Sequence, residues 1–183
     1  MSRRVIVVDV ETTGLDVRFA QVLEVAAVDL RTGELLEFVP HLDKRKLEHA
    51  DPTSFAVNGY YERRVFEREL DAEETCERYE QLHGMLDGAT LAGVNPRFDA
   101  ALLRRSFAEQ LRTWTEPWHH RLVDLSSYAA GALGVDPAEL PGLDECCALL
   151  GVNREERHSA TADALDTAAC FDLLDLRRKA GAS

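Results

Sequence analysis

The sequence predicts an α/β fold in which helices flank a mixed β-sheet. Two observations predict it. The first part of the chain holds three closely spaced segments of β type, and the rest alternates between segments of helical and strand type. Consecutive strands followed by alternating helices and strands are the order expected for a mixed sheet covered by helices.

The first three strands are expected at residues 3–10, 22–30 and 35–42. The first of them, RRVIVVDV, is an almost continuous β-branched run, which is typical of a strand buried on both faces. The stretch Arg31-Thr32-Gly33 supplies a turn between the second and the third. These segments predict a three-stranded antiparallel meander.

The remainder of the chain adds helices and two further strands. Asp51-Pro52-Thr53 opens a short helix, and Asn58-Gly59 ends it. Helical spacing of apolar residues and turn signals then predict helices at 72–87, 97–112, 126–133, 143–150 and 159–179, with strands at 90–94 and 121–125.

Length and composition predict one domain over residues 1–183, with 45% hydrophobic and 30% charged residues. No apolar run approaches the ~20 residues of a membrane span, so no membrane association is expected. Acids interrupt the apolar N-terminal stretch, which favours a first strand over a signal peptide. The four cysteines form no C-x-x-C pair, and we expect reduced thiols and a cytoplasmic protein.

The net charge of −12 argues against tight, nonspecific binding of duplex nucleic acid, which relies on a broad basic surface. It is compatible with an enzyme that holds one strand end through metal ions and a few local contacts.

The end of the first strand carries two acids, Asp9 and Glu11. They are two residues apart on a strand, so both side chains project from the same face. Two carboxylates ~5 Å apart repel by about 3 kcal/mol at an effective dielectric constant of 20, so a cluster of acids makes physical sense around divalent cations. The following Thr12-Thr13-Gly14 adds hydroxyls, amides and a flexible turn.

Three further residues complete a candidate catalytic site: the acids Asp99 and Asp163, which are candidate metal ligands with Asp9 and Glu11, and His158. Each has an ordinary alternative. Asp99 could be a first-turn acid favoured by the helix dipole, and His158 a surface residue before a helix. The combination of acids from three separate segments with a histidine indicates two-metal cleavage of a phosphodiester.

The segments DVETTGL, NPRFD and H-x4-D, in this order, resemble the three motifs of the DnaQ-like family of 3′→5′ exonucleases, in its DEDDh branch. The similarity extends over almost the whole chain. It implies a ribonuclease H-like fold and the removal of nucleotides from 3′ ends. Relatives of this kind include the proofreading subunit of the bacterial replicative polymerase, ribonuclease T and oligoribonuclease.

The resemblance also implies roles for the five residues. Asp9 would bridge two magnesium or manganese ions, Glu11 and Asp163 would hold the first ion, and Asp99 would serve the second. His158 would accept the proton of the attacking water.

Contacts with the terminal nucleotide follow from the same resemblance. Thr12 would meet the 3′ hydroxyl, Leu15 would wedge beside the base and Phe98 would line the pocket, while Thr13 and Asn58 complete the expected substrate-binding set. Many relatives have His-Gly-Ile where this chain has Asn58-Gly59-Tyr60, and His-Asn-Ala where it has Val94-Asn95-Pro96. These departures bear on substrate preference more than on the metal ligands.

The leading hypothesis is a metal-dependent 3′→5′ exonuclease on single-stranded 3′ ends that releases nucleoside 5′-monophosphates, with DNA favoured and RNA open. Alternatives are an oligoribonuclease-like enzyme on short RNA, a proofreading subunit and a non-catalytic binding module. A stand-alone enzyme is expected because the chain ends soon after Asp163, without an obvious tail for a polymerase. Some relatives are homodimers, and the sequence leaves this point open.

Overall fold

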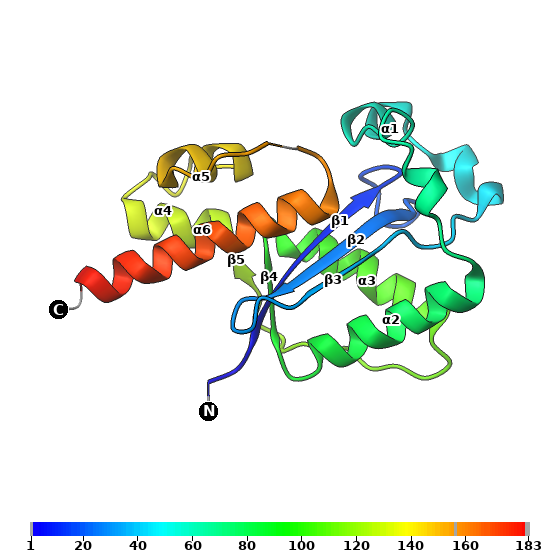
Figure 1. Ribbon diagram of the computed structural model, residues 1–183, viewed down its shortest axis with the longest axis horizontal. Coiled ribbons are helices and arrows are strands. Elements are labelled where there is room, and N and C mark those ends of the chain that lie inside the picture. Colours follow the sequence, from blue (N-terminus) through cyan, green and yellow to red (C-terminus); the bar gives the residue numbers. More distant parts are fainter. Residues whose placement is uncertain (1, 156, 182–183) are drawn as a thin grey trace.

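A five-stranded mixed sheet lies at the centre of the computed structural model, which describes residues 2–155 and 157–181 (Figure 1). The strand order is β3-β2-β1-β4-β5, in which β2 pairs antiparallel with both β1 and β3, and β1, β4 and β5 are parallel. The strands are β1 (Val5–Thr12), β2 (Val22–Asp29), β3 (Leu35–Phe38), β4 (Thr90–Gly93) and β5 (Val123–Asp124). The predicted fold class, an antiparallel meander plus two further strands flanked by helices, is confirmed.

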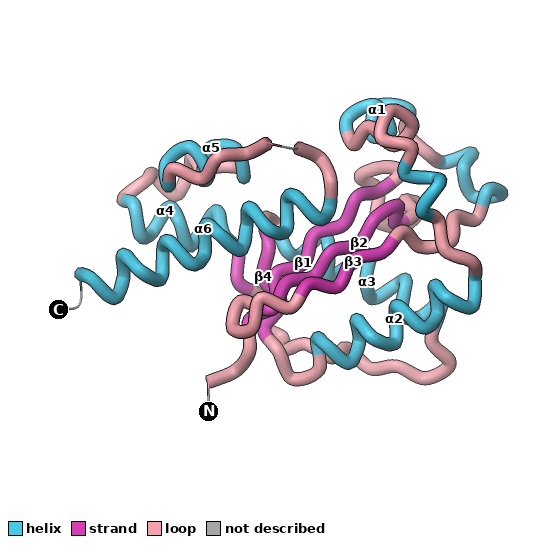
Figure 2. The backbone as a smooth tube through the Cα atoms, in the orientation of Figure 1, coloured by secondary structure: helices cyan, strands magenta, loops and turns pink. Residues whose placement is uncertain are grey.

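Helices occupy both faces of this sheet (Figure 2). In the described ranges they are α1 (Pro52–Val57), α2 (Ala72–Leu86), α3 (Pro96–Gln110), α4 (Leu125–Leu133), α5 (Leu143–Leu150) and α6 (Ala160–Gly181), together with the short 3-10 helices η1 (Lys44–His49) and η2 (Val65–Arg68). None of these helices combines the length and the apolar character that a membrane span needs.

Three strands differ from their expected bounds by more than one residue. β1 continues through Thr12, so both of its acids lie within the strand. The strand expected at 35–42 ends at Phe38, because Pro40 has no N–H to donate to a ladder. The strand expected at 121–125 is reduced to two residues, since the Asp124 carboxylate already caps α4 by accepting the Ser127 amide at 3.0 Å.

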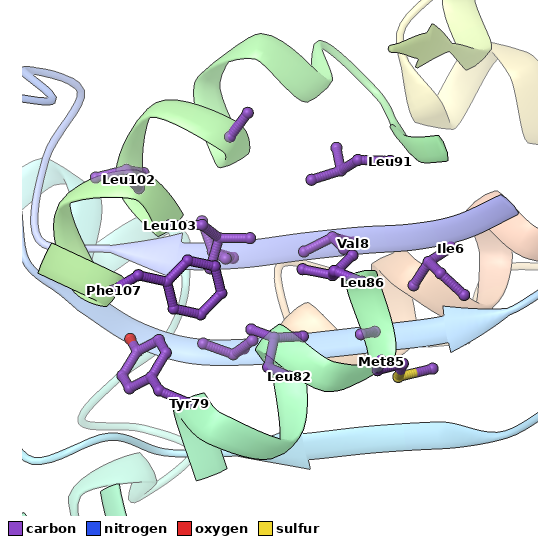
Figure 3. Packing of buried hydrophobic residues seen from close by; sticks show 14 of the residues in the cluster. Ile6, Val8, Tyr79, Leu82, Met85, Leu86, Leu91, Leu102, Leu103 and Phe107 are labelled. Atoms are coloured by element: carbon purple, nitrogen blue, oxygen red, sulfur yellow. The ribbon is translucent and has the colours of Figure 1, made fainter. Parts of the chain in front are cut away.

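One face of the sheet packs against α2 and α3. Ile6, Val8 and Val10 of β1 point to this side, where they meet apolar residues of both helices (Figure 3). The helical residues in this contact include Tyr79, Leu82, Leu86, Leu102, Leu103 and Phe107, and each is at most 2% exposed. At about 25 cal/mol per Å² of buried apolar surface, this layer is a main source of stability.

The other face packs against α4, α5 and α6. Val7, the alternate residue of β1, belongs to this side together with Leu125, Cys146 and Phe171. All four cysteines are free thiols, and three of them are buried.

A smaller apolar cluster covers the end of the sheet at which β1 finishes. It includes Leu23, Phe55, Tyr60 and Val65, from β2, α1 and the chain around η2. Figure 1 shows α1 beyond the arrowhead of β1 and the N-terminal end of α6 beside the same strand. This arrangement brings three distant parts of the chain to the end of the sheet at which β1 finishes.

Candidate active site

The two acids of β1 point toward α6. Strand residues alternate between faces, and Val7 packs on the α6 side, so Asp9 and Glu11 project there as well. The ladder with β2 runs in regular register from Ile6 to Glu11 and shifts only at Thr12, which keeps this alternation intact through both acids.

Asp99 reaches the same place from α3. The parallel pairing of β1 with β4 extends from Val5 to Val7, and α3 then begins at Pro96. The Val10 amide, beyond the end of this pairing, donates to Asp99 Oδ1 at 3.1 Å. Gly93 permits this close junction, because a Cβ there would lie 2.8 Å from the main-chain oxygen of Val8. Asp99 does lie in the first turn of α3, but it is only 5% exposed and is bound to the main chain of β1, so it is not a solvated acid.

Asp163 and His158 approach from the start of α6. Asp163 lies in the first turn of the helix, and His158 precedes the helix in the left-handed conformation, with φ of 57°. One ligand atom from each of Glu11, His158 and Asp163 lies within 4.8 Å of the other two. The structure thus brings together the strand acid and the two residues of the third motif.

Burial and mutual repulsion make these carboxyl groups hard to ionise. Burial raises the pKa of Asp9 well above its usual range, and the charges of Asp99, Glu11 and Asp163 raise it further. Burial, followed by the charges of Asp163 and Glu24, raises the pKa of Glu11 to about 8. Burial raises the pKa of Asp99 to about 7 although backbone hydrogen bonds oppose the rise. In the protein alone, the positive charges of Arg154 and Arg63 oppose this rise in the pKa of Asp9 and of Glu11, but burial outweighs them.

This donor set fits divalent metal ions. Carboxylate oxygens are the ligands that magnesium and manganese prefer, and a divalent cation would offset the repulsion that raises these pKa values. Glu11 and Asp163 could hold one ion with His158 beside it, and Asp9 and Asp99 lie next to this position. The residues thus suit a metal centre at the end of β1.

An arginine that the sequence did not indicate supports Asp163. The Arg154 side chain is only 6% exposed and forms ion pairs with Asp144, Asp163 and Asp166, the last at 2.9 Å. Its charge opposes the rise that burial causes in the pKa of Asp163. Nothing in the local pattern around Arg154 distinguishes it from a surface arginine, since its partners lie on α5 and α6.

The residues expected to contact substrate occupy different environments. Leu15 is 80% exposed, whereas Thr12, Thr13 and Asn58 are buried. The side-chain amide of Asn58 donates to the Thr12 main-chain oxygen at 3.2 Å, and the Thr13 hydroxyl accepts a hydrogen bond from the main-chain N–H of Gln21 at 2.9 Å. These buried side chains therefore hold the loop after β1 through hydrogen bonds to its main chain and to Gln21.

Phe98 is partly buried at the start of α3. It lines an open hollow of about 270 Å³ together with Val17, Asn95, Arg97 and Ala101. An aromatic ring at such a position offers a flat surface to a base. The roles of Leu15, Thr12, Thr13, Asn58 and Phe98 in binding substrate stay predictions.

Fold and site together define an α/β protein with a carboxylate site suited to divalent metals. The model of the RNase T family, described as exonuclease, matches residues 6–171, a range that includes every residue of the cluster. The chain belongs to this exonuclease family. No curated protein matches the chain.

Solved structures of exonuclease I share the fold. The enzyme from Methylocaldum szegediense is 22% identical with a TM-score of 0.73, covering 97% of this chain and 41% of that one. E. coli exonuclease I in complex with a dT13 oligonucleotide is 18% identical with a TM-score of 0.74, covering 97% and 42%. A zinc-bound form of the E. coli enzyme with single-stranded DNA is 19% identical with a TM-score of 0.75 and the same coverage.

These matches confirm the expected ribonuclease H-like fold. This chain spans about two fifths of the length of the solved exonucleases that it matches.

Proposed function

We propose that the protein is a metal-dependent 3′→5′ exonuclease that hydrolyses phosphodiester bonds at single-stranded 3′ ends and releases nucleoside 5′-monophosphates. The observation that carries this proposal is the convergence of Glu11, His158 and Asp163 within 4.8 Å, beside Asp9 at the end of β1. Membership of the exonuclease family supports it. DNA is the favoured substrate, because related folds have been solved with dT13 and dA16 oligonucleotides.

In this proposal Asp9, Glu11, Asp99 and Asp163 hold two magnesium or manganese ions. Such ions stabilise the negative charge that develops on the phosphoryl oxygens. The chain's own task is to bring four carboxyl groups together from β1, α3 and α6, where burial raises their pKa values in the absence of a cation.

His158 is the proposed general base. Its side chain is exposed at the edge of the cluster, where an attacking water has access. A neutral imidazole can accept the water's proton as the oxygen attacks phosphorus and the bond to the departing 3′ oxygen breaks. That departing oxygen then takes up a proton from solvent.

Leu15, Phe98 and the buried Thr12-Thr13 loop are proposed to hold the terminal nucleotide. Exposed Leu15 can pack beside the last base, and Phe98 lines the adjoining hollow. With a net charge of −12 the protein has little general attraction for phosphate backbones, so a grip limited to the strand end is favoured. Residues 1–183 would then form one exonuclease domain.

A ladder assay tests the proposal. DNA and RNA single strands labelled at the 5′ end are incubated with magnesium, manganese or a chelator, and shortening from the 3′ end with metal alone is expected. Asp163→Ala should abolish shortening while the protein stays folded, because Arg154 keeps Asp144 and Asp166 as partners. Asp172→Ala, an exposed acid on the same helix, is the matched control and should retain activity.

Undiminished degradation by Asp163→Ala or in chelator would contradict the metal assignment. Preference for a dinucleotide RNA over longer strands would instead favour an oligoribonuclease-like enzyme.

A further inference from the structure

Arg63 connects three segments beside the carboxylate cluster. Its guanidinium binds Glu24 of β2 in a bidentate pair, with Nη1 to Oε2 at 2.7 Å and Nη2 to Oε1 at 2.9 Å. Glu24 is 5% exposed and lies opposite Glu11 in the β1–β2 ladder. A buried carboxylate of this kind fixes the position of the arginine that neutralises it.

The same guanidinium reaches the loop that carries the proposed base. Arg63 Nη1 lies 2.9 Å from the main-chain oxygen of Asn58 and 3.0 Å from that of His158. Arg63 and His158 are 95 positions apart in sequence, so this contact exists only in the folded protein.

The chain is shaped to receive the Arg63 side chain. Gly59 has φ of +60°, and a Cβ at this position would lie 3.2 Å from Arg63 Cδ and 3.4 Å from Cγ. The aliphatic part of the arginine therefore lies over a glycine that has no side chain to displace it. The Arg63 side chain is 22% exposed as a result.

His158 is a residue that needs such support. Its φ of 57° lies in the left-handed region, which is unfavourable for a residue with a Cβ. Arg157 and the His158 side chain itself are exposed, whereas the chain becomes buried at Ser159, so packing alone does not hold the imidazole. A hydrogen bond to its carbonyl limits the rotation that would carry the imidazole away from Glu11 and Asp163.

We infer that Arg63 is a positioning residue for His158, holding its main chain so that the imidazole stays beside the metal ligands. This inference rests on the proposed function. Arg68 provides a matched comparison, because it pairs with the same Glu24 oxygen at 2.5 Å. Among the described residues it makes no hydrogen bond to the loop of His158.

Kinetics with five variants, counting His158→Ala as the reference for its double variant, test the inference. Arg63→Ala should lower kcat about tenfold with KM within about twofold, whereas Arg68→Ala should leave both within about twofold. In a His158→Ala background, Arg63→Ala should cause less than about a twofold further loss, because residues that act through one another are not additive. The double variant Glu24→Gln/Arg63→Ala, which also removes the charge of the buried acid that Arg63 neutralises, should match Arg63→Ala.

A second measurement needs no activity. Amide hydrogen exchange at residues 157–160 should be about tenfold faster in Arg63→Ala than in the wild type or in Arg68→Ala, with exchange in α5 unchanged. Unchanged exchange at 157–160 would overturn the inference, as would an equal loss of kcat from Arg63→Ala with and without His158. If the wild type degrades no nucleic acid, the proposed function fails, and Arg63 then has no reaction for which to position His158.

Discussion

The two faces of β1 carry opposite kinds of residue. Toward α2 and α3 the strand presents Ile6, Val8 and Val10, which are between 0% and 7% exposed in an apolar layer. Toward α6 it presents Val7 and then the acids Asp9 and Glu11. Along the same eight residues, one face contributes stability, and the end of the other gathers repelling charges that Arg154 and Arg63 offset only in part.

If this contrast holds, substitutions on one face of β1 and its layer should lower only activity, and substitutions on the other should lower only the free energy of unfolding. Substitutions at the acids should remove activity without loss of stability, and truncations on the opposite face should do the reverse. The following substitutions test the separation.

The largest effect is expected from Asp9→Asn. The change keeps the size of the side chain but removes a charge that the other carboxylates need for shared cations, so kcat should fall by at least about 10³-fold, or about 4 kcal/mol. Relief of repulsion should leave the melting temperature of the metal-free protein unchanged or higher. Turnover in a ladder assay and thermal unfolding in chelator measure the two quantities, and a loss of stability would break the contrast.

On the opposite face, Leu82→Ala should lower the free energy of unfolding by about 3 kcal/mol. Leu82 is 0% exposed in the layer between α2 and the sheet, and its truncation leaves a cavity. Because Leu82 lies on α2, against the face of the sheet opposite Asp9 and Glu11, kcat of the folded fraction should stay within about twofold of the wild type at low temperature. Urea unfolding and single-temperature kinetics check both statements.

The metal-free protein should lose stability as pH rises. The folded-state pKa of Glu11 is raised from 4.5 to about 8, so between these values the folded state binds more protons than the unfolded state, and stability falls with increasing pH. Glu11→Gln removes this contribution and should melt about 5 °C above the wild type near pH 8, and close to it near pH 5.

Manganese or magnesium should raise the wild-type melting temperature more at pH 8 than at pH 6, because the metal binds the ionised carboxylates. Melting curves in chelator and in metal measure this, and a pH-independent difference between the two proteins would contradict the electrostatic account.

The smallest effect is expected from Leu15→Ala. Since the Leu15 side chain is 80% exposed, its loss should leave stability unchanged. If Leu15 packs beside the terminal base, KM for single strands should rise about three- to tenfold with little change in kcat. An unchanged KM would remove Leu15 from the proposed substrate-binding residues.

Much of the fold is encoded in local patterns. The β-branched runs predict β1 and β2, and Asn95-Pro96 marks the change from β4 to α3 where the structure has it. The strand expected at 35–42 was too long, because the alternation continues past a proline that ends hydrogen bonding. The 3-10 helices η1 and η2 escaped prediction, since such short helices have no repeating apolar pattern.

The acids and the histidine were identifiable from residue type and order, but their surroundings were not. That the Val10 amide binds Asp99, that Arg154 joins three aspartates and that Arg63 reaches His158 are contacts between segments far apart in the chain. Their roles in catalysis and in binding nucleic acid stay predictions.

The sequence by itself determined the strands and helices, the family and the acids that it offers for metal binding, because period, turn residues and motif order are local properties. Only the tertiary structure decided that Asp9 and Glu11 face α6 and that an arginine supports each of Asp163 and His158. The reason is physical: which side of a strand meets which helix, and which buried charge finds which partner, depends on packing of the whole chain.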